Sequence, residues 1–469
     1  MDLLADHELQ ILVIAAVFAA AIVGAWKGIW KKIWQWIRPR QKPPSPPLPS
    51  PGPFQNIYGP AGTIQVFVGP GATAHVTVQY DYQDGVLKSP KIEVREQFQK
   101  GRAHLSRQNF NGAIQLFEEL LKIEDNAKLR GALFIQIGNA FFSLHQYIKA
   151  HECYASALRE AEKADDAEGR GSALGGIANT YLERPASDST ERGDNVKEAV
   201  KLYAQAVKFL HVDMYPVQFA NTRKHLGDAY IDLPSVTSEE RVSNVRQAIE
   251  CYQAALKVRK KDIYPVEFVG IQNSLGCAYL YLFAATPEGH EPSVREAIRN
   301  FEFGLEIYKK DDHPLGFAMI KSNLGAAYAN LAQIKTGRRD EYLRKAIACY
   351  EEALEVYNKD EHPLEFAATR NNLGGAYVNL QSFTMREWTE NIHRALACFF
   401  EVVEIWKKDI YPQKFCMAAN NIGLLLAKLG APEACQWLKE AYALREYLPD
   451  QGRAIEPMIE DICKDKPHE

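Results

Sequence analysis

A strong charge of either sign is missing from this sequence. Its 55 lysine and arginine residues are balanced by 59 aspartate and glutamate residues, which leaves a formal net charge of −4. Because nucleic acids are bound largely through basic surfaces, no nucleic-acid partner is expected.

Cysteine is also scarce, with 8 residues in 469. None lies in a CxxC pair or in a Cys/His cluster with metal-ligand spacing, so the sequence predicts no disulfide framework, metal site or cofactor. Four cysteines occupy the same position of a repeat, one residue before an aromatic side chain. This position favours helix packing in a reducing compartment, and the four residues are Cys153, Cys251, Cys349 and Cys398.

Catalytic motifs are absent too. There is no Walker-type glycine-lysine loop, no HExxH and no GxSxG. His313 and His362 resemble a matched pair, but they occupy the slot before a repeated proline where Tyr215, Tyr264 and Tyr411 stand elsewhere. They are interpreted as interchangeable residues of the repeat, and the chain is not expected to be an enzyme.

Long hydrophobic runs are missing except for one, at residues 9–26, which has no charged residue over 18 positions. That length suffices to cross a bilayer as a helix. Acidic residues precede the run, within a short tail at 1–8 that is expected outside the cytoplasm. A basic, tryptophan-rich segment at 27–38 follows and favours the cytoplasmic interface. The residues expected at the membrane interface are Trp26, Lys27, Trp30, Lys31, Lys32, Trp34 and Trp36. The sequence thus predicts a single-pass membrane protein with a cytoplasmic C-terminal part.

Two short segments follow the predicted membrane helix. Residues 39–55 are proline-rich, with eight of the 24 prolines at 39–53, which predicts an extended linker. Residues 56–84 alternate apolar and polar side chains, which predicts a β-hairpin with strands at Thr63–Val68 and Ala74–Tyr80. A lone hairpin is marginal in water, so it must pack on the repeats or pair with copies of itself. Its opening, NIYGPAGTIQV, also resembles amyloid-forming signalling motifs of the RHIM type.

Beyond residue 90 a helical pattern repeats every 49 residues. Three independent markers keep this spacing, and a fixed period of this size predicts a stacked solenoid. The glycines are Gly227, Gly276, Gly325, Gly374 and Gly423, the prolines are Pro216, Pro265, Pro314, Pro363 and Pro412, and the phenylalanines are Phe219, Phe268, Phe317, Phe366 and Phe415.

The pattern of each unit predicts two helices. The proline is expected to open the first helix, whose glycine lies where two helices approach closely. The second helix carries alanine, an aromatic residue and alanine on one face, as in Ala248, Tyr252 and Ala255. Between the two helices we expect loops of about ten residues, at 233–244, 282–293, 331–342 and 380–391.

These motifs resemble the tetratricopeptide repeat family, with its Leu-Gly-x-x-Tyr and Ala-x-x-x-Phe/Tyr-x-x-Ala signatures. The usual period of the family is 34. The earlier units around Gly101 and Gly138 are closer to that length and keep the usual 12-residue offset between the first-helix glycine and the second-helix alanine, whereas the later units add a longer loop and a longer second helix. The resemblance implies an all-α, right-handed solenoid of helical hairpins, with about eight repeats at 93–448 and a capping tail at 449–469.

In proteins of this family the first helices line a groove that docks protein partners. The residues expected there stand two positions before each Leu-Gly or Ile-Gly pair, and they are Lys224, Asn273, Ser322, Asn371 and Asn420. They could hydrogen-bond an extended peptide, or they could be tolerated polar positions. The neighbouring column is not basic, so the carboxylate clamp of chaperone-binding members is not evident. The row of long loops is a second candidate face.

The predicted function is therefore a membrane-anchored scaffold that binds a protein or peptide partner. Two alternatives stay open. One is a signalling or assembly protein that self-associates through residues 56–82 and forms homo-oligomers. The other is an import or chaperone-docking receptor of the tetratricopeptide type.

Overall fold

The structure is a computed structural model, and it describes residues 56–57, 64–65, 92–286, 291–447, 456, 459, 462 and 463. The predicted membrane helix at 9–26, its interfacial segment at 27–38 and the proline-rich linker at 39–55 lie outside the described residues.

The β segment shows a pairing that differs from the expected one. Strand β1 (Asn56–Ile57) pairs antiparallel with β2 (Ile64–Gln65), with Asn56 opposite Gln65. Strand β2 falls inside the first predicted strand, but its partner precedes it in the chain. The predicted partner at Ala74–Tyr80 lies outside the described residues. Glycine-proline stretches flank residues 63–68 on both sides, so turn chemistry alone allowed either pairing.

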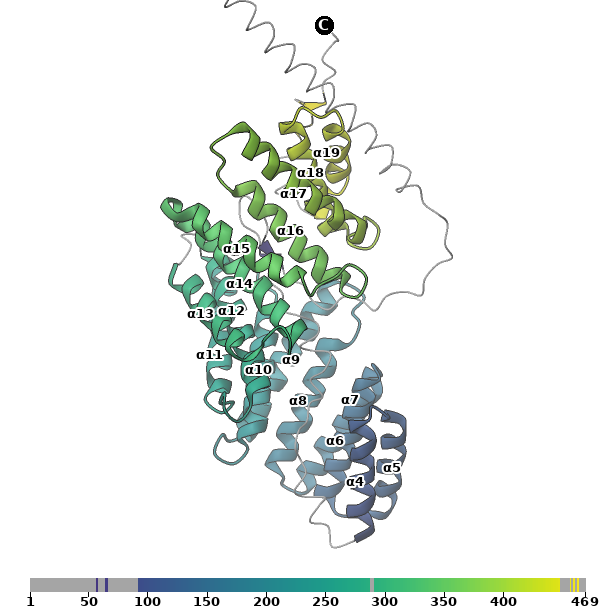
Figure 1. The fold of residues 1–469 in the computed structure, drawn as a ribbon. Helices are drawn as coiled ribbons and strands as arrows, with labels where there is room; N and C mark the ends of the chain where they lie inside the picture. Colours follow the sequence, from purple (N-terminus) through teal and green to yellow (C-terminus); the bar gives the residue numbers. More distant parts are fainter. Residues whose placement is uncertain are drawn as a thin grey trace, which may run out of the picture. The chain divides into compact units, whose positions relative to one another are not determined.

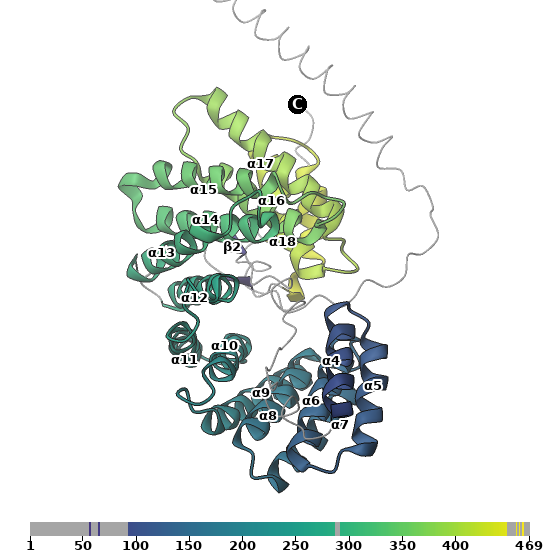
Figure 2. The same ribbon diagram turned by 60° about the horizontal axis from the view of Figure 1, so that its bottom comes forward.

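The rest of the described chain is an all-α repeat solenoid (Figures 1 and 2). Consecutive helices form hairpins, and each helix packs mainly on its neighbours along the chain, as a solenoid requires. The first members of the hairpins are α4 (Ile92–Ser106), α6 (Ala127–Ser143), α8 (Ala167–Glu183), α10 (Pro216–Asp232), α12 (Pro265–Ala285), α14 (Pro314–Ile334), α16 (Pro363–Asn379) and α18 (Pro412–Lys428). The second members are α5 (Phe110–Ile123), α7 (Tyr147–Lys163), α9 (Ser189–Phe209), α11 (Ser238–Leu256), α13 (Glu291–Ile307), α15 (Arg339–Leu354), α17 (Met385–Ile405) and α19 (Ala434–Tyr442).

The repeated glycine is the point of closest approach within each hairpin, as the sequence predicted. A Cβ atom added to Gly276 would lie 2.6 Å from Cε1 of Phe301, and one added to Gly227 would lie 2.7 Å from Cε1 of Tyr252. Distances this short do not occur between real Cβ atoms and their neighbours, so any larger residue must displace the ring. In the repeats of Gly227, Gly276, Gly325 and Gly374, the aromatic residue of the second helix therefore packs directly on the glycine of the first, whereas Gly423 meets Leu438.

The repeated prolines open helices α10, α12, α14, α16 and α18, each at the first turn. Proline suits this position because its fixed φ is helical and its missing N–H has no intrahelical acceptor there. The residue before each proline is the N-cap, and this is where His313 and His362 lie. Their interpretation as interchangeable residues of the repeat agrees with that position.

The expected ten-residue loops are wrong in length. Three connections span residues 233–237, 335–338 and 380–384, because helical turns absorb the remaining residues. Residues 287–290 of the fourth lie outside the described part of the chain. Helices α12 and α14 are 21 residues long, whereas α11 and α17 begin early at capped threonines. Thr237 accepts a hydrogen bond from the backbone N–H of Glu240, and Thr384 accepts one from that of Glu387. These capping-box patterns were readable in the sequence and would have shortened the predicted loops.

Among the described helices, α12 is long and apolar enough to cross a membrane. However, 61% of its most apolar window is buried inside the protein. It packs against α11 and α13 and contributes Leu275 and Tyr281 to the largest apolar cluster. Its apolar character is that of a core helix in the solenoid.

Candidate partner-docking face

The five predicted groove residues lie at equivalent positions of α10, α12, α14, α16 and α18, but the structure gives them different surroundings. Three of them are bonded within the solenoid. The other two, Asn371 and Asn420, carry buried side-chain oxygens that have no hydrogen-bond partner in the described part of the chain. The candidate face is therefore narrower than the sequence predicted.

Lys224 on α10 is neutralised inside its own helix. Its Nζ lies 2.7 Å from Oδ2 of Asp228, one turn further on. The hydroxyl of Tyr252 on α11 donates to Oδ1 of the same carboxylate at 2.8 Å. Next to them, burial and the charge of Lys224 lower the pKa of His225 to about 4. Lys224, Asp228 and Tyr252 therefore form a compact polar network, in which the positive charge of Lys224 is already paired with a carboxylate.

Asn273 and Ser322 connect neighbouring first helices. Asn323 on α14 donates from Nδ2 to Oδ1 of Asn273 on α12 at 2.8 Å, and both residues are buried. The hydroxyls of Ser322 on α14 and Thr369 on α16 lie 3.2 Å apart and share one hydrogen bond. Buried polar groups need such partners. Here the partners belong to the next repeat, so these two residues hold the stack in register.

Asn371 on α16 is also buried, with 3% of its surface exposed, yet its Oδ1 accepts no hydrogen bond from the described residues. Asn420 on α18 is half-buried, and its Oδ1 is in the same state. A buried carbonyl oxygen without a donor costs on the order of 1–3 kcal/mol. Native proteins seldom keep such groups without a reason.

Gly375 lies one turn after Asn371, on the same side of α16. A Cβ added to Gly375 would meet no atom within 4 Å, in contrast to the glycines packed under aromatic rings. No described atom therefore fills the position beside Gly375 itself, although strand β2 packs against α14 and α16 elsewhere. On α18 the residue equivalent to Gly375 is the half-buried Leu424, one turn after Asn420. Together, Asn371, Gly375, Asn420 and Leu424 define what we call the α16–α18 face.

Chemically, the α16–α18 face presents two hydrogen-bond acceptors beside a small and an apolar residue. Amide oxygens accept from backbone N–H groups, and a glycine allows a backbone to approach closely. The equivalent positions on earlier helices are Asp228, Cys277 and Ala326, so the column is not basic. The arrangement suits an extended polypeptide better than a carboxylate or a phosphate.

The second candidate face, the row of connections between helices, is shorter than expected but carries exposed apolar side chains. Val236 is 95% exposed and Phe383 is 79% exposed. The backbone N–H groups of these two residues, each just before an N-cap threonine, donate to Oε2 of Glu240 and Glu387, respectively. Helix α17 begins two residues after Phe383. One side of this helix, from Met385 to Ala397, lines an open hollow of about 640 Å³. The sequence indicated this row of connections as a second candidate face, but it did not distinguish Val236, Phe383 or the side of α17 within it.

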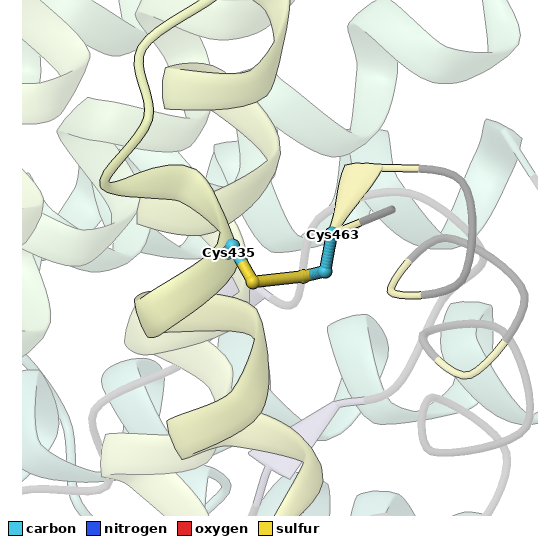
Figure 3. Close-up of a disulfide and its surroundings, with 2 residues drawn as sticks. All are labelled: Cys435 and Cys463. Carbon is cyan, nitrogen blue, oxygen red and sulfur yellow. A yellow bond between two sulfur atoms is a disulfide. The ribbon is translucent and has the colours of Figure 1, made fainter. Parts of the chain in front are cut away.

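No group of three or more histidine, cysteine, aspartate or glutamate side chains that could hold a metal ion occurs within the described residues. The rings of His313 and His362 instead pack beside Tyr308 and Tyr357 at the joints between repeats. Three of the four repeat cysteines, Cys251, Cys349 and Cys398, are buried and Cys153 is half-buried, as expected for helix packing. By contrast, the expectation of no disulfide is wrong for one pair, Cys435 and Cys463 (Figure 3).

No family model matches this chain. No curated protein matches it either. Among solved structures, the chain is similar to the C-terminal part of a tetratricopeptide repeat-containing protein from Cytophaga hutchinsonii, at 14% identity and a TM-score of 0.38, over 66% of this chain and 95% of that one.

Two further solved structures show the same kind of similarity. A tetratricopeptide repeat protein from Parabacteroides merdae is 14% identical over 70% of this chain and 99% of that one, with a TM-score of 0.41. A signal transduction ATPase with a tetratricopeptide repeat sensor from Pyrococcus horikoshii is 17% identical over 69% of this chain and 44% of that one, with a TM-score of 0.45. The likeness concerns the fold. By its own helix contacts and glycine–aromatic packing, this chain is a solenoid of helical hairpins.

Proposed function

We propose that this chain is a non-enzymatic, membrane-anchored scaffold that docks an extended segment of a protein partner on its α16–α18 face. The observation that carries the proposal is the buried Oδ1 of Asn371, which accepts no hydrogen bond from the described residues; one turn further on, a Cβ built on Gly375 meets no atom within 4 Å. A partner backbone lying along this face supplies the missing N–H donors.

The proposed geometry gives affinity without a strong sequence requirement. Backbone N–H groups occur in every polypeptide except at proline, so the two asparagines select an extended conformation rather than a particular side chain. Specificity then comes from the partner side chains that pack against Leu424 and its neighbours. The near-neutral surroundings favour an uncharged or weakly charged segment.

The anchor belongs to the proposal as well. The uncharged run at 9–26 and its basic, tryptophan-rich flank support a single pass with the repeats in the cytoplasm. A proline-rich spacer at 39–55 holds the solenoid away from the bilayer. Confinement to a membrane raises the rate at which the scaffold meets partners on that membrane. If residues 9–26 anchor the protein, the full-length chain should stay in the membrane fraction during alkaline carbonate extraction. A variant that lacks residues 9–26 should be released.

The docking proposal is tested in two stages. Proximity labelling from the full-length protein in its membrane first identifies candidate partners. Binding of the purified candidate is then measured by calorimetry for the wild type and for Asn371→Leu, Asn420→Leu and the double variant. We expect about a tenfold loss of affinity for each asparagine.

Asn273→Leu is the matched control, because Asn273 stands at the equivalent position of α12 but is bonded to Asn323. Its partner affinity should equal that of the wild type under conditions where it is folded. Equal affinity for all of these variants would rule out docking on the α16–α18 face and direct attention to Phe383 and the hollow beside α17.

A further inference from the structure

A second column of polar residues runs along the first helices, five residues after each repeated glycine. Each member follows the predicted groove residue of the same helix by eight residues, about two turns, and so lies on the same side of that helix. We call this set the second polar column. Its members on α10, α12, α14 and α16 are Asp232, Tyr281, Asn330 and Asn379.

The two outer members of the second polar column are bonded inside the solenoid. Oδ2 of Asp232 on α10 lies 3.9 Å from Nη2 of Arg192 on α9. Nδ2 of Asn379 on α16 donates to the carbonyl oxygen of Gly375 at 2.8 Å, and its Oδ1 accepts from Nη2 of Arg339 on α15 at 2.8 Å. Both side chains therefore have partners on their own or a neighbouring helix.

The two inner members, Tyr281 on α12 and Asn330 on α14, lack such partners. Each residue is 3% exposed. The hydroxyl of Tyr281 and Nδ2 of Asn330 make no hydrogen bond with any residue of the described chain. Burial raises the pKa of Tyr281, so its hydroxyl keeps its proton and is a hydrogen-bond donor. Buried donors without acceptors are rare in native proteins.

The groups without described partners differ in kind between the two columns. On α16 and α18, Asn371 and Asn420 present carbonyl oxygens, which accept hydrogen bonds. On α12 and α14, Tyr281 and Asn330 present O–H and N–H groups, which donate them. A polypeptide backbone carries both the N–H groups that the first pair needs and the carbonyl oxygens that the second pair needs. A carboxylate satisfies only the second pair, because it has no donor.

The first helices of successive repeats lie side by side on the inner side of the solenoid (Figure 2). Helix α12 contacts α14, and α14 contacts α16. Strand β2, an extended segment of the chain itself, packs against both α14 and α16. With about 8–10 Å between packed helices, the path from α12 to α18 measures roughly 24–30 Å. An extended polypeptide of about eight residues covers this path at about 3.3 Å per residue.

From these observations we infer that the docking surface continues from the α16–α18 face across α14 to α12, and that Tyr281 and Asn330 donate hydrogen bonds there to backbone carbonyl oxygens of an extended partner segment. This inference rests on the proposed function, because it extends the same surface. It also restricts the sequence of the segment. Proline is excluded where the segment faces α16 and α18, since proline has no N–H, but it is tolerated where the segment faces α12 and α14.

A peptide library is the probe for this surface. Random 12-residue peptides displayed on phage are panned on the full-length protein in lipid nanodiscs, and one enriched peptide is synthesised. Its affinity is measured by calorimetry for the wild type, Tyr281→Phe, Asn330→Leu and Asn371→Leu. We expect about a tenfold loss for each variant. Tyr281→Phe removes a single oxygen atom, so it decides the question even if Asn330→Leu does not fold.

Tyr279→Phe is the matched control. It removes a hydroxyl from the same helix, but this hydroxyl accepts a hydrogen bond from Nε2 of Gln253 on α11 at 3.3 Å. The affinity of this variant for the peptide should equal that of the wild type. A proline scan of the peptide should find intolerant positions at one end only, where its N–H groups meet Asn371 and Asn420. Tolerance throughout the peptide, or intolerance throughout, would overturn the inference.

Failure of the inference is distinguishable from failure of the proposed function. Loss of affinity in Asn371→Leu alone would confine docking to the α16–α18 face and overturn only the extension to α12. Equal affinity in every variant, or a library without an enriched peptide, would overturn both. Without peptide, Tyr281→Phe should unfold at the same urea concentration as the wild type or a higher one. A lower midpoint would mean that the Tyr281 hydroxyl already has a partner within the chain, which overturns its role in docking.

Discussion

The ring of Tyr350 on α15 lies so close over Gly325 on α14 that a Cβ added to the glycine would fall 2.7 Å from its Cε1 atom. The same relationship recurs between Gly374 and Phe399, one repeat further on. The repeated glycine and the repeated aromatic residue, 25 positions apart in the sequence, are thus two halves of one contact.

Replacing Gly325 with alanine should destabilise the solenoid by about 1–3 kcal/mol, because the added methyl group forces the buried Tyr350 ring out of its place. Urea denaturation followed by circular dichroism measures the loss. Gly375→Ala is the control: its Cβ meets nothing within 4 Å, so relief of the helical glycine penalty should stabilise it by about 0.5–1 kcal/mol. Equal changes in the free energy of unfolding for the two variants would contradict the packing of the Tyr350 ring on Gly325.

Asn273→Leu and Asn371→Leu should have different effects on stability, although both replace a buried asparagine at the same position of the repeat. The first removes the acceptor of Asn323 Nδ2 and should cost about 1–2 kcal/mol. The second removes a carbonyl oxygen without a described partner, so the free energy of unfolding should be unchanged or slightly raised. A large destabilisation by Asn371→Leu would mean that Asn371 has a structural partner.

His225 should make the protein less stable in mild acid. Burial and the charge of Lys224 lower its pKa to about 4 from an ordinary value near 6.5. Between these values the unfolded chain binds a proton that the folded protein does not, so stability falls as pH falls from about 6.5 to 4. Replacement of His225 by glutamine should reduce this dependence by up to about 1.4 kcal/mol per pH unit. Denaturation midpoints across this pH range provide the measurement.

Lys414 should make the stability of the protein depend on pH above about 8. It is buried near the rings of Trp406 and Tyr411, and burial lowers its pKa to about 8. Below pH 8 the folded protein holds a buried charge that the unfolded chain solvates better. We expect Lys414→Met to be more stable than the wild type at pH 7. The difference should shrink as pH rises from about 8 towards 10.5, where the lysine is neutral in both states. A constant difference would show that charge burial is not the cause.

Four ion pairs recur at equivalent positions of the later repeats, and each should contribute little to the free energy of unfolding. Lys261 pairs with Glu306 at 2.5 Å and Lys408 with Glu440 at 2.8 Å, and between them Lys310 pairs with Glu355 and Lys359 with Glu404. All of these side chains are substantially exposed, so each coupling should be below about 1 kcal/mol and weaken in salt. A double-mutant cycle at Lys261 and Glu306, with and without 1 M salt, measures it.

The sequence alone was enough for the repeat architecture. A proline that opens a helix, a glycine that admits a ring and alanines on one helical face act locally or between adjacent helices, so their spacing carries the fold. The same locality explains why the positions of the first helices in the later repeats were predicted well. It does not extend to the connections, where the N-cap threonines Thr237 and Thr384 begin helices inside the expected loops.

Only the tertiary structure distinguished the residues of the candidate face from one another. Asn273 and Asn371 occupy the same place in the repeat, but one meets Asn323 and the other meets no described donor. Hydrogen-bond satisfaction depends on the residue across the helix–helix contact, and that neighbour varies between repeats while the period does not. The Cys435–Cys463 bond was equally hidden, because it depends on the tail returning to α19 and follows no repeat. Periodicity therefore determined the scaffold, whereas contacts between unlike neighbours decided which of its polar positions have a hydrogen-bond partner among the described residues.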